Sequence, residues 1–141
     1  MTPVNSSDKP LIHVVGVGLD GLAGLAQANL ALIQRAVVLV GSDRLLSYVT
    51  EGQAERWPLN DLKTTLERLR QWLTSGTGIA VVLASGDPLF FGLGRLLIDH
   101  LPPESLAFHP HLSAVQLAFS RLKLPWQGAT LVSAHGRSPE A

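Results

Sequence analysis

The sequence alternates between short apolar runs without charged residues and longer segments in which leucines recur at helical spacing. Uncharged apolar runs suit strands that are covered on both faces of a parallel sheet, whereas the leucine spacing is that of one helix face. The pattern predicts five strands, at 11–17, 37–41, 79–84, 106–109 and 130–133. It predicts helices between them, at about 25–35, 42–48, 60–76, 91–101 and 113–122. The alternation favours an α/β fold, with a five-stranded, mostly parallel sheet and helices on both faces.

Two of the predicted helices carry boundary signals. Asn60 is a candidate N-cap of the helix at 60–76, and Gly76 follows its last apolar position. The apolar positions of this helix are Leu62, Leu66, Leu69 and Leu73. The stretch before it, up to Trp57 and Pro58, is expected to be a polar connection. Ser113-Ala-Val-Gln116 has the spacing of a capping box and predicts where the last helix begins.

Composition narrows the class of protein. The chain has 141 residues, 46% of them hydrophobic, which is enough for one domain with its own core. The 11 basic residues balance 11 acidic ones, so the chain lacks the positive charge that nucleic-acid binding requires. It contains no cysteine, which excludes disulfides and thiolate metal sites and fits the cytoplasm. Its apolar runs are shorter than the roughly 20 residues that cross a membrane, and residues 1–10 are expected to form a loose tail.

The segment from Ala80 to Arg95 predicts a ligand site. Here a buried strand turns into a helix through Gly86, whose backbone lets a ligand approach closely, and Asp87, a candidate helix cap. Ligands of open α/β sheets bind beyond the carboxyl ends of the strands, which is where this corner lies. One carboxylate beside unblocked main-chain groups suits a small molecule that carries amino or hydroxyl groups.

A second glycine-rich turn, Gly16-x-Gly18-x-x-Gly21, follows the first predicted strand and supports a different hypothesis. It matches the dinucleotide fingerprint, and Asp43 stands near the end of the second strand, where such proteins bind a ribose. An NAD-binding oxidoreductase domain is therefore an alternative. Against it, Leu22-Ala-Gly24 delays the helix, and the phosphate geometry depends on a helix N-terminus. A third interpretation is a noncatalytic half-domain that serves as an interaction module.

Five motifs, in the same order along the chain, resemble the tetrapyrrole methylase family. They are Val15-Gly-Val-Gly-Leu-Asp-Gly-Leu-Ala-Gly-Leu25, Val40-Gly-Ser-Asp-Arg-Leu45, Leu83-Ala-Ser-Gly-Asp-Pro-Leu-Phe-Phe-Gly-Leu-Gly-Arg95, Ser113-Ala-Val-Gln-Leu-Ala-Phe-Ser-Arg-Leu122 and Val132-Ser-Ala-His-Gly-Arg137. The resemblance covers nearly everything from Leu11 to Arg137. The order of Asp20 and Gly21 is similar to the branch that methylates a corrin-ring precursor at C-5 in cobalamin biosynthesis.

The resemblance implies an enzyme that transfers a methyl group from S-adenosylmethionine to a precorrin, either metal-free or cobalt-containing. It also implies how the chain is organised. Residues 11–134 would form the first α/β domain, and residues 135–141 would begin the linker to a second domain that completes the cofactor site. The full enzyme is expected to be a homodimer.

The resemblance and the positions of the corners together nominate site residues. The candidates for cofactor binding are Gly18, Ser85, Gly86, Asp87, Leu89, Phe90, Ser113 and Ala114. The arginines that would bind substrate carboxylates are Arg44, Arg95 and Arg137. His135 is the candidate catalytic base, and the remaining histidines are scattered without metal-ligand spacing, so no metal site is expected. Ser85, His111 and Ala114 depart from the glycine, the proline-glycine and the serine or threonine that are usual in the family.

Overall fold

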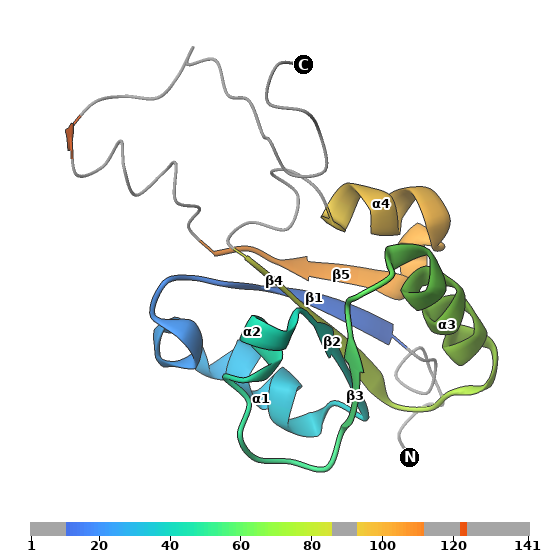
Figure 1. Cartoon of the computed structure of the whole chain (residues 1–141), viewed down its shortest axis with the longest axis horizontal. Coiled ribbons are helices and arrows are strands. Elements are labelled where there is room, and N and C mark those ends of the chain that lie inside the picture. The colour runs from blue at the N-terminus through green and yellow to red at the C-terminus, as the bar shows by residue number, and fades with distance from the viewer. Residues whose placement is uncertain (1–10, 86–92, 112–121, 124–141) are drawn as a thin grey trace, which may run out of the picture.

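A computed structural model describes residues 11–85, 93–111 and 122–123, and the fold is given for these residues. Its centre is a sheet of five parallel strands in the order β3-β2-β4-β1-β5. The strands are β1 (Leu11–Val17), β2 (Val38–Gly41), β3 (Glu55–Pro58), β4 (Ile79–Ser85) and β5 (Leu106–His109). β2, β4 and β1 each have a strand on both sides, whereas β3 and β5 form the edges (Figure 1).

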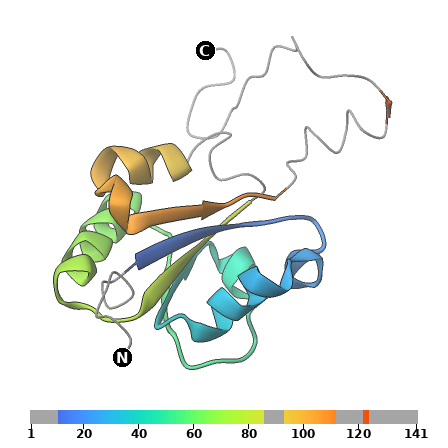
Figure 2. The ribbon, with the colours of Figure 1, turned by 180° about the vertical axis from the view of Figure 1, so that it is seen from behind.

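Helices cover both faces of the sheet, as the sequence pattern predicts. They are α1 (Gln27–Arg35), α2 (Asp43–Leu46), α3 (Leu62–Ser75) and α4 (Leu93–His100), with short 3-10 turns η2 (Gly21–Gly24) and η3 (Pro103–Ser105). α1 and α2 pack on one face of the sheet, and α3 and α4 pack on the other. The same two layers are seen from behind in Figure 2. The predicted α/β architecture is confirmed.

The central strands are apolar at nearly every position because they supply side chains to both faces. On β1, Ile12 and Val14 join the core under α3 and α4, whereas Val15 and Val17 join the core under α1 and α2. All four side chains are 3% exposed or less. This burial on both faces is typical of parallel sheets and explains why the strand shows no alternation of apolar and polar residues.

The N-cap of α3 is Asp61, so the prediction of Asn60 is wrong by one residue. Asp61 has an extended backbone, and its carboxylate accepts from the main-chain nitrogen of Lys63 at 3.1 Å. The hydroxyl of Thr64 also donates to this carboxylate, at 2.7 Å. These hydrogen bonds lower the pKa of Asp61, the largest cause being the bond from the Thr64 side chain. Asn60 lies one residue too early to reach the first free amide groups of the helix.

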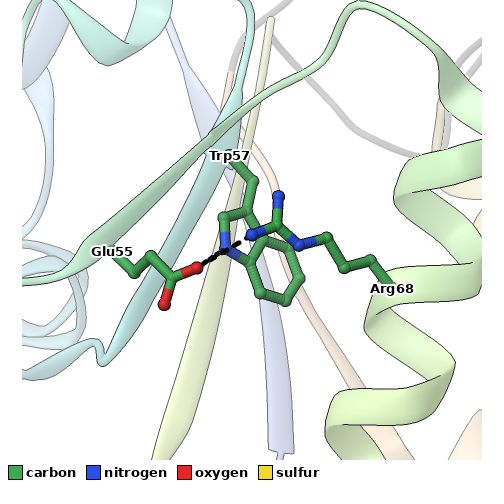
Figure 3. A network of polar contacts seen from close by, with 3 residues as sticks. All are labelled: Glu55, Trp57 and Arg68. Carbon is green, nitrogen blue, oxygen red and sulfur yellow. Dashed lines mark hydrogen bonds and ion pairs between the residues drawn. The ribbon is translucent and has the colours of Figure 1, made fainter.

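β3 replaces the polar connection expected before Pro58, and this is a second correction. Of its four residues only Trp57 is buried, at 6% exposure. Figure 3 shows how the strand is fixed: Trp57 Nε1 donates to the carboxylate of Glu55 at 2.7 Å, and Arg68 of α3 donates to the same oxygen at 2.9 Å. The guanidinium of Arg68 lies over the indole ring, 4.2 Å from its centroid. A single buried side chain in four residues is too short a pattern for periodicity to indicate a strand.

Several expected elements lie outside the described residues. These are the tail at 1–10, the helix at 113–122 except for its last residue, the strand at 130–133 and the domain boundary at 134. They stay predictions. None of the described helices is both long and apolar enough to span a membrane.

Candidate functional site

The carboxyl ends of the parallel strands lie along one side of the sheet, which we call the carboxyl edge to distinguish it from the outer strands β3 and β5. Val17, the last residue of β1, pairs with Ser85, the last residue of β4. The end of β2 at Gly41 leads directly into Ser42, whose hydroxyl accepts from the main-chain nitrogen of Leu45 at 3.2 Å and caps α2. The turn after β1 and the end of β5 lie at this same edge, to the left in Figure 1 and to the right in Figure 2. This is the edge at which open α/β sheets bind ligands.

The glycine-rich turn after β1 does not lead straight into an α-helix. Gly21 donates to the carbonyl of Gly18 at 3.1 Å and has a φ of +59°, which favours glycine. The turn continues as η2, and α1 begins only at Gln27. A dinucleotide site requires the helix N-terminus at the glycine turn. The geometry therefore does not support the NAD-binding alternative, and Asp43 is simply an exposed residue in the first turn of α2.

The side chain of Arg44 links α2 to the end of β4. Its guanidinium donates to the hydroxyl of Tyr48 at 3.1 Å and to the hydroxyl of Ser85 at 3.1 Å. Tyr48 in turn packs against the glycine turn, since a Cβ at Gly21 would lie 3.5 Å from the Tyr48 ring. Two of the predicted site residues, Arg44 of the substrate set and Ser85 of the cofactor set, are thus brought into direct contact.

His111, which follows β5, covers the glycine turn from another side. Its Nε2 lies 3.3 Å from the carbonyl of Gly24, and a Cβ at Gly18 would come within 2.5 Å of its Nδ1. The Nδ1 atom is buried and has no hydrogen-bond partner among the described residues. A cofactor would have to contact Gly18 through main-chain groups, because the imidazole fills the space beside its Cα. No pattern in the sequence predicts this packing, since His111 stands out only as a departure from the family pattern.

A pair of histidines joins β1 to β5, with His13 in the first half of β1 and His109 at the end of β5. Nδ1 of His13 and Nε2 of His109 are 3.0 Å apart, and the two rings are stacked with their centroids 5.2 Å apart. Burial lowers the pKa of His13, and the neighbouring His109 and Arg35 lower it further. Burial also lowers the pKa of His109. Two imidazoles alone do not make a metal centre, and within the described ranges no three potential metal ligands come together.

The remaining predicted site residues are not brought into this network. Arg95 is exposed on α4, with no hydrogen-bond or ion-pair partner among the described residues. The others lie outside the described residues: Gly86, Asp87, Leu89, Phe90, Ser113, Ala114, His135 and Arg137. Their roles stay predictions.

The sheet order, the two helical layers and the polar carboxyl edge define an open α/β domain of the class that binds small ligands beyond its strand ends. Comparison with known proteins identifies the family within this class. Residues 11–141 match the family described as Tetrapyrrole (Corrin/Porphyrin) Methylases, and the chain belongs to this family.

Individual relatives agree with this family. The chain is 38% identical to a precorrin-6Y C(5,15)-methyltransferase (decarboxylating) of Sinorhizobium, over 97% of this chain and 34% of the relative. It is 35% identical to a cobalt-precorrin-7 C(5)-methyltransferase of Salmonella typhimurium, over 90% of this chain and 62% of the relative. A crystal structure of a precorrin-6Y methylase from Archaeoglobus fulgidus superposes with a TM-score of 0.67 at 27% identity, over 89% of this chain and 65% of that one. The chain thus spans between about a third and two thirds of these proteins.

Proposed function

We propose that this chain is part of an enzyme that methylates a corrin-ring precursor at C-5, with S-adenosylmethionine as the methyl donor. The observation that carries the proposal is the alignment with two kinds of relatives. One kind is named for positions 5 and 15, the other for position 5 alone. The chain matches a third of the first kind and nearly two thirds of the second, so the shared segment is the one expected to serve position 5.

The described edge fits part of the proposed cofactor. S-adenosylmethionine carries a carboxylate, an amino group, ribose hydroxyls and a positively charged sulfonium. The edge offers N–H donors on Arg44 and a hydroxyl on the exposed Ser85. The exposed turn at Leu19 and Asp20 adds main-chain groups. When bound, the cofactor supplies an electrophilic methyl group. The role of the protein is to bind the two reactants and orient them, which can lower the barrier of a bimolecular reaction by about 7–11 kcal/mol.

The proposal includes features that extend beyond the described residues. Asp87 would bind the amino or ribose hydroxyl groups, with Gly86, Leu89, Phe90, Ser113 and Ala114 completing the cofactor contacts. A second domain after residue 134 would close the site, and a homodimer in the cytoplasm would be the working form. The precorrin is the proposed partner, and nucleic acid has no role.

Calorimetric titration with S-adenosylhomocysteine tests this function directly. It is carried out on this chain and on the product of its whole gene, each also as the Asp87→Ala variant, with NAD as the competing ligand. The proposal is supported if the protein binds S-adenosylhomocysteine and if Asp87→Ala weakens this binding about 10-fold or more, since a charge-assisted hydrogen bond is lost. Binding of NAD alone would restore the oxidoreductase interpretation, and binding of neither ligand would favour a noncatalytic module.

A further inference from the structure

Arg44 is held in a different way from the arginines on α3. Arg68 and Arg70 form ion pairs with Glu55 and Glu67. Arg44 donates to two neutral hydroxyls, and no acidic side chain pairs with it in the part of the chain that the structure describes. Hydroxyl oxygens fix the direction of a guanidinium, but they leave its positive charge uncompensated. Among the described residues, the charge of Arg44 is thus oriented but not balanced by a carboxylate, which suits an anionic ligand.

The guanidinium also keeps hydrogen-bonding capacity. One terminal nitrogen donates to Tyr48 and the other donates to Ser85. Each terminal nitrogen carries a second N–H, and Nε carries its own, so these donors are not used by the two hydroxyls. Adjacent N–H groups of a planar guanidinium match the two oxygens of a carboxylate. The unused donors can therefore form a bidentate contact.

The neighbours of Arg44 are anchored to the framework of the sheet. Ser85 ends β4 in register with Val17 of β1. Tyr48 is half-buried, lies under the glycine turn at Gly21, and its ring centroid is 6.0 Å from the guanidinium carbon. The helix that carries Arg44 is capped by Ser42. The end of β4 and a tyrosine packed against the turn after β1 thus set the position of one cation at the ligand edge.

We propose that Arg44, oriented by Tyr48 and Ser85, forms a carboxylate-binding site at the carboxyl edge of the sheet. The ligand class rests on the proposed function, because both the methyl donor and the tetrapyrrole acceptor carry carboxylates. The carboxylate comes either from the amino-acid part of the cofactor or from a side chain of the tetrapyrrole. Arg44 is the binding residue, whereas Tyr48 and Ser85 are positioning residues.

The test compares three ligands by titration of the product of the whole gene. S-adenosylhomocysteine carries the cofactor carboxylate, 5′-methylthioadenosine lacks it, and uroporphyrin carries carboxylate side chains on a tetrapyrrole. The variants are Arg44→Gln, Arg44→Lys, Tyr48→Phe and Ser85→Ala. Arg35→Gln is the matched control, since it removes an exposed arginine that ends α1 just before β2 begins, at the opposite end of the strands from Arg44. All of these side chains except Tyr48 are exposed, and circular dichroism verifies that each variant folds.

We expect Arg44→Gln to weaken the binding of one carboxylate ligand about 10-fold or more. Arg44→Lys should weaken it less, because lysine keeps the charge but lacks the planar guanidinium. If Arg44→Gln weakens the binding of S-adenosylhomocysteine but not of 5′-methylthioadenosine, the bound carboxylate is that of the cofactor. If it weakens the binding of uroporphyrin, the bound carboxylate is that of the tetrapyrrole. Tyr48→Phe and Ser85→Ala should each weaken the binding of the same ligand about 2-fold to 5-fold.

An Arg44→Gln protein that binds every ligand as well as the Arg35→Gln control overturns the site. The proposed function survives that result if S-adenosylhomocysteine still binds. Failure of the unmodified protein to bind S-adenosylhomocysteine, together with Arg44-dependent binding of uroporphyrin, overturns the cofactor assignment and supports the site. Binding of neither carboxylate ligand overturns both.

Discussion

The imidazole of His111 occupies the space that a side chain at Gly18 would need, so the turn after β1 and the segment after β5 are locked together. A Cβ at residue 18 would approach His111 Nδ1 to 2.5 Å. Gly18→Ala must therefore displace the ring, and we expect it to reduce the free energy of unfolding by about 1–3 kcal/mol, as overpacking does. Urea denaturation measures this change.

The double variant Gly18→Ala with His111→Ala provides the control for that prediction. Removing the imidazole makes room for the new methyl group, so the two changes together should cost less than the sum of the single changes. Strict additivity would show that the ring does not lie against Gly18 in solution.

The histidine pair makes stability depend on pH in a defined direction. The pKa values of His13 and His109 are lowered in the folded chain, from 6.5 in the absence of the fold, so unfolding takes up protons as the solution is acidified. The stabilising contribution is complete above pH 6.5 and is lost as the pH falls from there through the folded values. We expect a lower free energy of unfolding at about pH 5.5 than at about pH 7.5.

Replacing both members of the pair with glutamine should remove much of that pH dependence. His100→Gln is the matched control, because His100 is exposed at the end of α4. Equal pH dependence in the pair variant and in the control would exclude the pair as the cause.

Adjacent residues on α4 distinguish the buried face from the exposed face. Leu97 is fully buried, whereas Ile98 is 41% exposed. Leu97→Ala should therefore destabilise the chain by about 2–5 kcal/mol, because it removes buried methyl groups and leaves a cavity. Ile98→Ala, of similar size, should cost less than about 1 kcal/mol. Comparable losses of stability for the two variants in thermal or urea denaturation would show that α4 is rotated about its axis, with a different face toward the sheet.

The edge strand β3 should depend on the burial of Trp57 far more than on the ion pair beside it. Arg68 and Glu55 have side chains that are 50% and 62% exposed, and exposed pairs contribute about 0–1 kcal/mol. Arg68→Gln should therefore have a small effect that added salt reduces, whereas Trp57→Ala should cost about 3–5 kcal/mol. A large, salt-insensitive loss in Arg68→Gln would assign the stabilisation to the guanidinium packed on the indole instead.

The capping of α3 offers a further comparison of neighbours. Asp61→Ala removes the acceptor for Lys63 and Thr64, so it should lower the melting temperature, and Asn60→Ala should not. The pKa of Asp61 is lowered in the folded chain, so its contribution is present above pH 3.8 and is lost as the pH falls through the folded value. An equal effect of both substitutions would return the cap to Asn60.

The sequence predicts the strands that are buried on both faces and misses the one that is not. β1 and β4 carry no charged residue and are apolar at most positions, and their bounds match the prediction closely. β3 has one buried side chain, so its identity as a strand depends on pairing with β2, which local sequence does not encode. The sequence places the cap of α3 one residue early, at Asn60, because Asn60 and Asp61 are both good capping residues and only the backbone conformation distinguishes them.

For the candidate site, the sequence identified individual residues but not their contacts. Arg44 and Ser85 were both nominated, yet the hydrogen bond that joins them spans 41 positions. The contact between His111 and Gly24 spans 87. Such pairs are created by the order of the strands, and a single sequence carries no local signal for that order.

The strand order also bears on how the chain is made. Of the described strands, β1 leaves the ribosome first, but its partners are β4 and β5, so neither of them exists until residue 79 has been added. β2 and β3 are the earliest strands that can pair with each other. The middle of the sheet is therefore completed late in synthesis, and the growing chain carries an unpaired, strongly apolar segment for much of that time. Such a segment is prone to aggregate until β4 arrives to cover it.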